Sequence, residues 1–112
     1  MAESNSKVFP IKLSSEFTEI TKKGRKVRAS SYLTLILLDS KDDLAYFGTT
    51  VSKKVGSAVV RNKLKRWVRN CVRSAGWSSK FKSKKVVFMF RPQPEGFYKK
   101  LKYSDFVECV LA

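Results

Sequence analysis

The chain has 112 residues and an uneven charge, because 24 Lys and Arg residues stand against 9 Asp and Glu residues and give a formal net charge of +15. Folding does not require this excess, since self-repulsion opposes compaction, so it indicates a partner of high negative charge density, either nucleic acid or an anionic membrane surface. No apolar run approaches the roughly 18 residues of a membrane-spanning helix, so we expect no membrane span.

The length and the 43% share of hydrophobic residues suit a single domain over residues 1–112. The first ten residues, MAESNSKVFP, lack the apolar core of a signal peptide, so we expect a cytoplasmic protein. In that compartment Cys71 and Cys109 are expected to be reduced, and a disulfide between them is the alternative if the compartment is an oxidising one. The chain has no histidine, and two isolated thiols do not form a zinc site.

The chain is predicted to start with an extended or mobile lead-in over residues 1–12, because the segment is polar and mixed and contains proline. A short helix is predicted over residues 13–24. Ser14 or Ser15 can cap its start, and Gly24 can close its end.

Three strands are predicted from β-branched and aromatic content. Residues 26–38 form the first, and a polar turn at 40–43 leads to the second at 44–52, so that the two make a hairpin. Residues 85–90 form the third strand, which is buried and is stopped by the prolines that follow.

Two further helices complete the chain. Residues 53–76 are predicted to form one long helix that Gly76 ends, followed by a basic loop at 77–84. Residues 103–111 form a short last helix with Ser104 as its cap. The order α-β-β-α-β-α predicts an α+β sandwich, a small sheet covered by helices.

The long helix separates into two faces on a helical wheel at about 100° per residue. Its apolar arc, which is predicted to pack on the sheet, contains Val60, Leu64, Trp67, Val68, Cys71, Val72 and Ala75. Its opposite arc is basic and contains Arg61, Asn62, Lys65, Arg66, Arg69 and Arg73, with Lys63 and Asn70 at its edge.

No acidic residue offsets this basic arc, because the chain has no Asp or Glu between residues 44 and 94. Surface helices usually balance like charge with Glu–Lys pairs, so a simply solvated face is the weaker of two explanations. Arginine binds phosphate through two parallel hydrogen bonds and lysine acts as a point charge, so the arc suits a nucleic acid. Because the surface is a rigid helix, we expect it to recognise a defined shape such as folded RNA.

Other residues extend this surface without adding a catalytic centre. Further basic side chains flank the helix at Lys53, Lys54, Lys80, Lys82, Lys84, Lys85 and Arg91. Most aromatic residues are expected in the core, and one or two on an open sheet face could stack on unpaired bases.

Catalysis by this chain is not expected, since it has no histidine and its carboxylates are scattered. Another molecule would supply the chemistry.

The segment GTTVSKKVGSAVVRNKLKRWVRNCVR at 48–73 resembles the signature of the bacterial ribonuclease P protein subunit. Residues 16–27 and 86–94 are similar to the first helix and last strand of that family, and the resemblance covers residues 13–111. It implies an α/β sandwich with a left-handed β-α-β crossover, a fold also found in a ribosomal protein domain. It also implies a subunit that assists a catalytic RNA in removing the 5′ leader from precursor tRNA, with the active site and its Mg²⁺ ions in the RNA and no cofactor on the protein.

The resemblance assigns roles to residues of this chain. The RNA subunit would be bound by Arg61, Asn62, Lys63, Lys65, Arg66, Arg69 and Arg73. The leader of the precursor tRNA would be bound by Phe17, Lys53, Lys54 and Arg91. The chain departs from the family pattern at Lys63, where arginine is usual, and at Thr21 and Leu35, where aromatic residues are usual. Leader binding would therefore depend more on charge than on stacking.

Two alternatives remain open at this stage. A structural RNA-binding protein of ribosomal type fits the composition and the fold class equally well. A protein of the membrane surface needs an apolar face beside the basic one, for which Trp77 and Phe81 are the candidates. The resemblance to the ribonuclease P family implies the RNA subunit and precursor tRNA as partners. It implies neither membrane binding nor an obligate protein partner.

Overall fold

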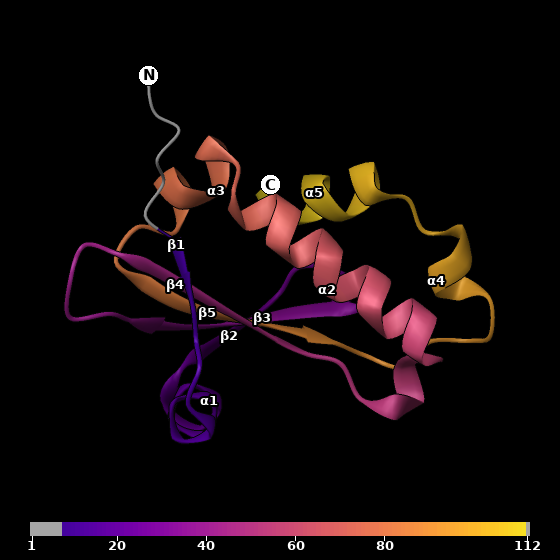
Figure 1. Cartoon of the computed structure of the whole chain (residues 1–112), viewed down its shortest axis with the longest axis horizontal. Coiled ribbons are helices and arrows are strands. Elements are labelled where there is room, and N and C mark those ends of the chain that lie inside the picture. The colour runs from indigo at the N-terminus through magenta and orange to yellow at the C-terminus, as the bar shows by residue number, and fades with distance from the viewer. Residues whose placement is uncertain (1–7, 112) are drawn as a thin grey trace.

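A computed structural model describes residues 8–111, except for the side chain of Ala75. Its centre is a five-stranded sheet in the order β1-β4-β5-β3-β2 (Figure 1). The strands are β1 (Val8–Pro10), β2 (Arg25–Arg28), β3 (Leu33–Asp39), β4 (Ala45–Thr50) and β5 (Lys84–Phe90). β4 runs parallel to both β1 and β5, whereas β3 runs antiparallel to both β5 and β2. The predicted mixed α+β class is confirmed.

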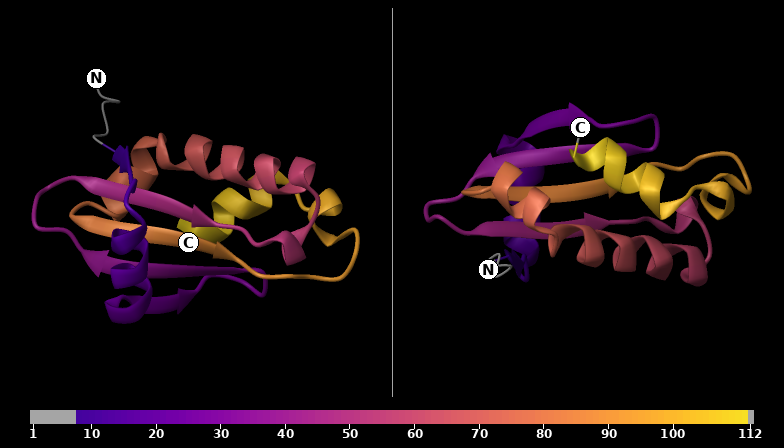
Figure 2. Two further views of the ribbon diagram at one scale, coloured as in Figure 1. Left: turned by 60° about the horizontal axis from the view of Figure 1, so that its bottom comes forward. Right: turned by 90° about the horizontal axis from the view of Figure 1, so that it is seen from above.

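The helices lie on both faces of this sheet. They are α1 (Ser14–Lys23), α2 (Ala58–Val72), α3 (Ala75–Lys80), α4 (Phe97–Lys100) and α5 (Tyr103–Leu111), with a 3₁₀ turn, η1 (Lys53–Val55), before α2. Figure 1 shows α1 on one side of the sheet and the other helices on the opposite side. In Figure 2, α2 and α5 run over the same face of the sheet, where they contact each other.

The predicted hairpin between residues 26–38 and 44–52 is wrong. β5 lies between β3 and β4 and pairs with both, with Val87 opposite Ile36 on one side and Gly48 on the other. β5 is apolar on both faces, so the central position buries both sets of its side chains. The chain passes from β4 to β5 through α2 and α3, and the left-handed course of this crossover stays a prediction.

Two other strand predictions need correction. Residues 26–38 do not form one strand, because the chain turns at 29–32 and β2 folds back on β3, with Arg25 opposite Leu37. The amide groups of Ala29 and Ser30 both donate to the carbonyl oxygen of Leu33 and close this turn. Residues 8–10 of the expected lead-in form β1, which pairs with β4; residues 1–7 of that lead-in lie outside the described part of the chain.

The predicted helix over residues 53–76 is three pieces. Gly56 separates η1 from α2, and Ser57 caps α2 by accepting a hydrogen bond from the amide of Val60. Ser74 caps α3 in the same way through the amide of Trp77. The capping serines predicted elsewhere are wrong, since α1 begins after Leu13 without a side-chain cap and Ser104 lies inside α5.

The expected basic loop at 77–84 carries part of the hydrophobic core. Trp77 is 0% exposed and Phe81 is buried, and the Trp77 ring lies within 6.1 Å of the Phe88 ring, centroid to centroid. The two aromatic residues that a membrane-surface protein would need are therefore inside the protein. No helix in residues 8–111 is long and apolar enough to cross a membrane.

Candidate nucleic-acid interface

Helix α2 packs one side on the sheet and exposes the opposite side. Leu64, Val68, Cys71 and Val72 are buried in the main core. The exposed side carries Asn62, Lys65, Arg66, Arg69 and Arg73 at its surface or end. The apolar contacts hold the helix rigidly, so these side chains project from a fixed backbone.

Arg61, predicted in the basic arc, and Lys63, predicted at its edge, are both half-buried and bonded within the protein. The Nε of Arg61 donates a hydrogen bond of 3.2 Å to the carbonyl oxygen of Gly56. The ammonium of Lys63 donates one of 2.7 Å to the carbonyl oxygen of Tyr98 and lies 5.0 Å from the centroid of the Trp67 ring. The exposed face of α2 is therefore narrower than the wheel predicted.

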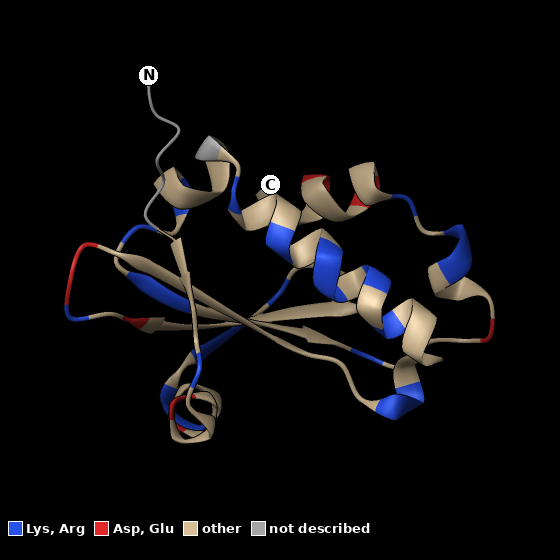
Figure 3. Cartoon of the chain, viewed as in Figure 1, with Lys and Arg blue, Asp and Glu red and all other residues tan. Residues whose placement is uncertain are grey.

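No carboxylate neutralises this face within residues 8–111. Ion pairs in this part of the chain join Lys23 to Glu19, Lys84 to Asp39 and Lys85 to Glu16, and none of these three involves α2. Figure 3 shows basic residues along α2, with acidic residues on α1, on α5 and in peripheral turns. The positive potential over α2 is therefore available to an anionic partner.

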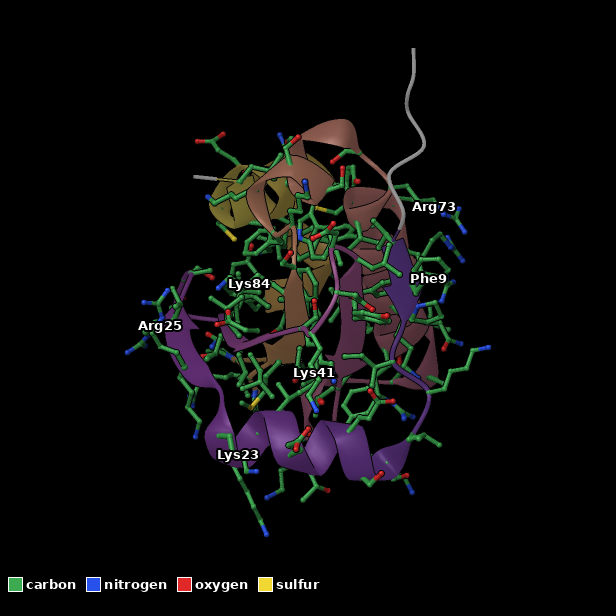
Figure 4. All side chains as sticks on the ribbon, turned by 90° about the vertical axis from the view of Figure 1, so that its left-hand side faces the viewer. Phe9, Lys23, Arg25, Lys41, Arg73 and Lys84 are labelled. Atoms are coloured by element: carbon green, nitrogen blue, oxygen red, sulfur yellow. The ribbon has the colours of Figure 1, made fainter. Side chains whose placement is uncertain are left out.

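A groove begins beside this face, between α2 and strands β1 and β4. Its cavity volume is about 390 Å³, and Lys65, Arg69 and Arg73 line it on the helix side. Phe47 and Val72 provide apolar surface inside the groove, and Phe17 from α1 also lines it. In Figure 4, Arg73 and Phe9 lie on the same side of the molecule. The fold thus brings Phe17, a predicted leader-binding residue, to the same groove as three predicted RNA-binding residues.

Phe17 is positioned by a close approach to the sheet. A Cβ atom built on Gly48 would lie 2.4 Å from the Cζ atom of Phe17, so glycine leaves the space that the ring occupies. Thr21, one turn later, donates its hydroxyl to the carbonyl oxygen of Phe17 at 2.8 Å and offers no aromatic ring.

Leu35 does not belong to the α1 side of the sheet. Its side chain is buried in the main core, whereas Ile36 packs with Phe17 in a second cluster around α1. Because side chains alternate across a strand, a leader-binding cleft beside α1 would involve Thr34 or Ile36 and not Leu35. The assignment of the missing aromatic residue to position 35 is therefore corrected.

The other predicted leader-binding residues lie beyond the ends of two parallel strands. Lys53 and Lys54 follow β4, and Arg91 follows β5, so that all three lie at the same end of the sheet. All three are exposed. The Nε of Arg91 donates a hydrogen bond of 3.2 Å to the hydroxyl of Thr34 on the α1 side of the sheet. Phe17 lies further back, against the middle of β4.

Phe9 is an exposed aromatic residue that sequence reasoning missed. It is 43% exposed, stands opposite Tyr46 in the β1–β4 pair, and its ring lies 6.1 Å from that of Tyr46. The hydroxyl of Tyr46 donates a hydrogen bond of 2.7 Å to the carboxylate of Asp42. This bond is the main cause of a raised pKa of Tyr46 and a lowered pKa of Asp42. Alternation of apolar and polar residues around position 9 was too short to indicate a strand.

The cysteines and acidic residues in the described part of the chain have no arrangement typical of a metal or redox centre. Cys71 and Cys109 are both free, and burial raises the pKa of the Cys71 thiol to about 11. Within residues 8–111, no group of three or more Cys, Asp or Glu side chains is placed to hold a metal ion.

An α+β sandwich with an unneutralised basic helix beside an open groove is typical of the class of nucleic-acid-binding proteins. The family model described as ribonuclease P matches residues 6–110. The chain therefore belongs to the ribonuclease P protein family.

Individual relatives agree with this assignment. The ribonuclease P protein component of Bacillus pumilus is 30% identical over 94 residues, 84% of this chain and 79% of that protein. The component from Clostridioides difficile is 36% identical over 63 residues, 56% of this chain and 54% of the relative. The chain spans about half the length of the Clostridioides difficile component and of several other curated relatives that it matches.

Solved structures of the family share the fold. The RNase P protein from Thermotoga maritima is 27% identical, with a TM-score of 0.77 over 91% of each chain. The RNase P protein of Staphylococcus aureus is 29% identical, with a TM-score of 0.75 over 90% of this chain and 87% of that one. The five-stranded sheet with its helices is therefore the architecture of the family.

Proposed function

We propose that the chain is the protein subunit of a ribonuclease P, and that it assists a catalytic RNA in removing the 5′ leader from precursor tRNA in the cytoplasm. The observation that carries this proposal is the unneutralised basic face of α2 in a chain of the ribonuclease P family. The RNA subunit holds the active site and its Mg²⁺ ions, and the protein supplies binding energy and no catalytic group or cofactor.

The exposed residues of α2 bind the phosphates of the RNA subunit. Lys65, Arg66, Arg69 and Arg73 project from one rigid helix, and each phosphate they neutralise releases condensed counterions. Asn62 adds a donor and an acceptor for a sugar hydroxyl or a base edge. Arg61 and Lys63 border this surface and also hold the ends of neighbouring segments in place.

The leader of the precursor tRNA is bound beside α1. Phe17 offers ring surface, and Lys53, Lys54 and Arg91 offer charge at the adjacent end of the sheet. Since Thr21 carries no ring, the affinity of the leader depends mainly on its phosphates. A protein that binds the leader raises affinity for precursor tRNA above that for mature tRNA.

Reconstitution tests the proposal directly. The chain is added to a bacterial ribonuclease P RNA at a magnesium concentration too low for the RNA alone, and cleavage of precursor tRNA is followed. We expect the protein to restore leader removal, because it offsets phosphate repulsion that magnesium would otherwise screen. No increase in cleavage would overturn the proposal.

A second measurement separates this function from that of a ribosomal-type RNA-binding protein. The full chain is purified with its bound RNA, and that RNA is sequenced. Ribonuclease P RNA and tRNA precursors support the proposal, whereas ribosomal RNA alone contradicts it.

A further inference from the structure

A second groove lies at the opposite edge of the sheet, between strands β2 and β3 and helices α3 and α5. Its cavity volume is about 480 Å³, and Val27, Leu35, Leu37 and Val110 give it an aliphatic lining. In Figure 4, Arg25 and Lys84, which also line the groove, lie on the other side of the molecule from Arg73 and Phe9. The groove is therefore separate from the proposed RNA interface.

The outer wall of this groove is the edge of the sheet at β2. Within residues 8–111, β2 is the last strand of the sheet and pairs only with β3. All four of its residues are exposed, and Val27 keeps 37% of its surface exposed. The outer main-chain groups of such a strand are a template for one more strand from another chain.

Basic side chains surround the aliphatic lining. Arg25 and Arg28 extend from β2, while Lys80 and Lys84 line the groove near β5. Asp39 accepts a hydrogen bond from Lys84, so one carboxylate offsets part of this charge. The groove keeps an excess of positive charge for a ligand.

A second copy of this chain is a poor occupant. Pairing of two β2 strands would place Arg25, Lys26 and Arg28 beside the same residues of the partner, and like charges on neighbouring strands destabilise a sheet. Unpaired RNA bases are also a poor match for the aliphatic lining, because they stack on exposed aromatic rings. The aromatic residue that lines this groove, Phe81, is only 6% exposed.

We propose that this groove binds an extended acidic segment of another protein, which adds a strand beside β2. Main-chain hydrogen bonds to β2 provide the pairing. Apolar side chains of the segment cover Val27 and Leu37, and its carboxylates, on the opposite face of the added strand, meet Lys26 and Arg28. This inference does not depend on the function proposed for α2, since the two surfaces lie at opposite edges of the sheet.

The probe is a fluorescent peptide of about eight residues, a usual strand length, in which valine and glutamate alternate. Two control peptides carry serine in place of valine, or N-methyl groups on alternate amides. We expect the first peptide to bind the full-length chain and to slow amide hydrogen exchange in residues 25–28. Both control peptides should bind at least about tenfold more weakly, a difference of about 1.4 kcal/mol. Equal binding of all three would show charge attraction alone and overturn the proposal.

Charge reversal locates the site. We expect Lys26→Glu with Arg28→Glu, which reverses the charge on the face that the glutamates meet, to lower the affinity for the valine–glutamate peptide by about tenfold or more. The matched variant, Arg66→Glu with Arg73→Glu, should lower it less than about threefold, because salt screens distant charges. Circular dichroism verifies that each variant folds, and the peptide comparison on the unmodified chain stands without them. The proposal fails if the two charge-reversal variants lose the same affinity for the peptide. It also fails if oligouridylate displaces the peptide from the unmodified chain and the β2 variant no longer binds oligouridylate.

Discussion

The ammonium group of Lys63 lies 2.7 Å from the carbonyl oxygen of Tyr98 and over the ring of Trp67. This contact joins the second turn of α2 to α4 through two residues that lie 35 positions apart in the chain. A residue that the family resemblance assigns to RNA binding thus also has a structural role. Arginine, which is usual at this position, would bring a larger, planar group to a carbonyl that accepts a single lysine hydrogen bond.

Replacement of Lys63 should therefore affect stability before it affects RNA binding. We expect Lys63→Met to lower the free energy of unfolding by about 1 kcal/mol, because the Tyr98 carbonyl loses a charged donor. Lys65→Met, on the exposed side of the same helix, should change it by less than about 0.5 kcal/mol. Urea denaturation measures both values. A stable Lys63→Met variant with RNA binding as weak as that of Lys65→Met would contradict the structural role.

The salt dependence of RNA binding measures the contacts of α2. Lys65→Ala with Arg69→Ala removes two exposed cations, so we expect the slope of log K against log salt concentration to become shallower by about 2. Lys99→Ala with Lys100→Ala, an equal loss of charge on α4, is the matched control and should leave the slope nearly unchanged. Titration of ribonuclease P RNA at several salt concentrations gives both slopes. Equal changes in the two variants would mean that net charge matters and the face of α2 does not.

Gly48 is required by its neighbour Phe17. We expect Gly48→Ala to lower the free energy of unfolding by about 1–3 kcal/mol, because the new methyl group overlaps the Phe17 ring and α1 must shift. Gly76→Ala is the control, since its Cβ would meet only Leu111 at 3.8 Å and alanine favours a helix. Thermal unfolding compares the two variants. The leader contact depends on the same packing, so Gly48→Ala should also reduce the preference for precursor over mature tRNA.

The bond from Tyr46 to Asp42 gives a pH-dependent contribution to stability. It lowers the folded-state pKa of Asp42, so this stabilisation is fully present above the ordinary pKa of an aspartate and is lost as the pH falls through the lowered value. We expect Tyr46→Phe to unfold at a lower temperature than the unmodified chain at pH 7, and this difference to shrink in acid. Melting temperatures from pH 7 to strongly acidic solution measure it. For the control variant Tyr103→Phe, the difference in melting temperature from the unmodified chain should stay the same as the pH falls into the range where Asp42 is protonated.

Local sequence patterns were enough for the elements whose reasons are local. Helix α1 and the last helix follow from apolar spacing, and β5 from a run of β-branched and aromatic residues between turn signals. The basic character of α2 follows from the absence of acidic residues between 44 and 94. The block of residues 48–73 was sufficient to indicate the ribonuclease P family, which the family match confirms.

Strand pairing could not be predicted from neighbours in sequence. The hairpin expected between the first two predicted strands, residues 26–38 and 44–52, is absent because β5, more than 30 residues later, buries both of its faces between β3 and β4. β1 is only three residues long and is a strand only because β4 offers it a free edge. The split of residues 26–38 depends on a turn that β-propensity alone did not reveal.

The sequence by itself determined that the protein is basic, that one helix carries an unneutralised positive face, and which family it resembles, because composition and spacing along one helix are properties of neighbouring residues. Tertiary structure alone decided which of those basic side chains remain available to bind an anionic partner. Arg61 and Lys63 lie near carbonyl groups of Gly56 and Tyr98, and only packing reveals such partners. It also decided that Phe17 shares a groove with Lys65 and Arg69, and that β2 forms a basic edge of the described sheet. Both depend on contacts between segments distant in the chain.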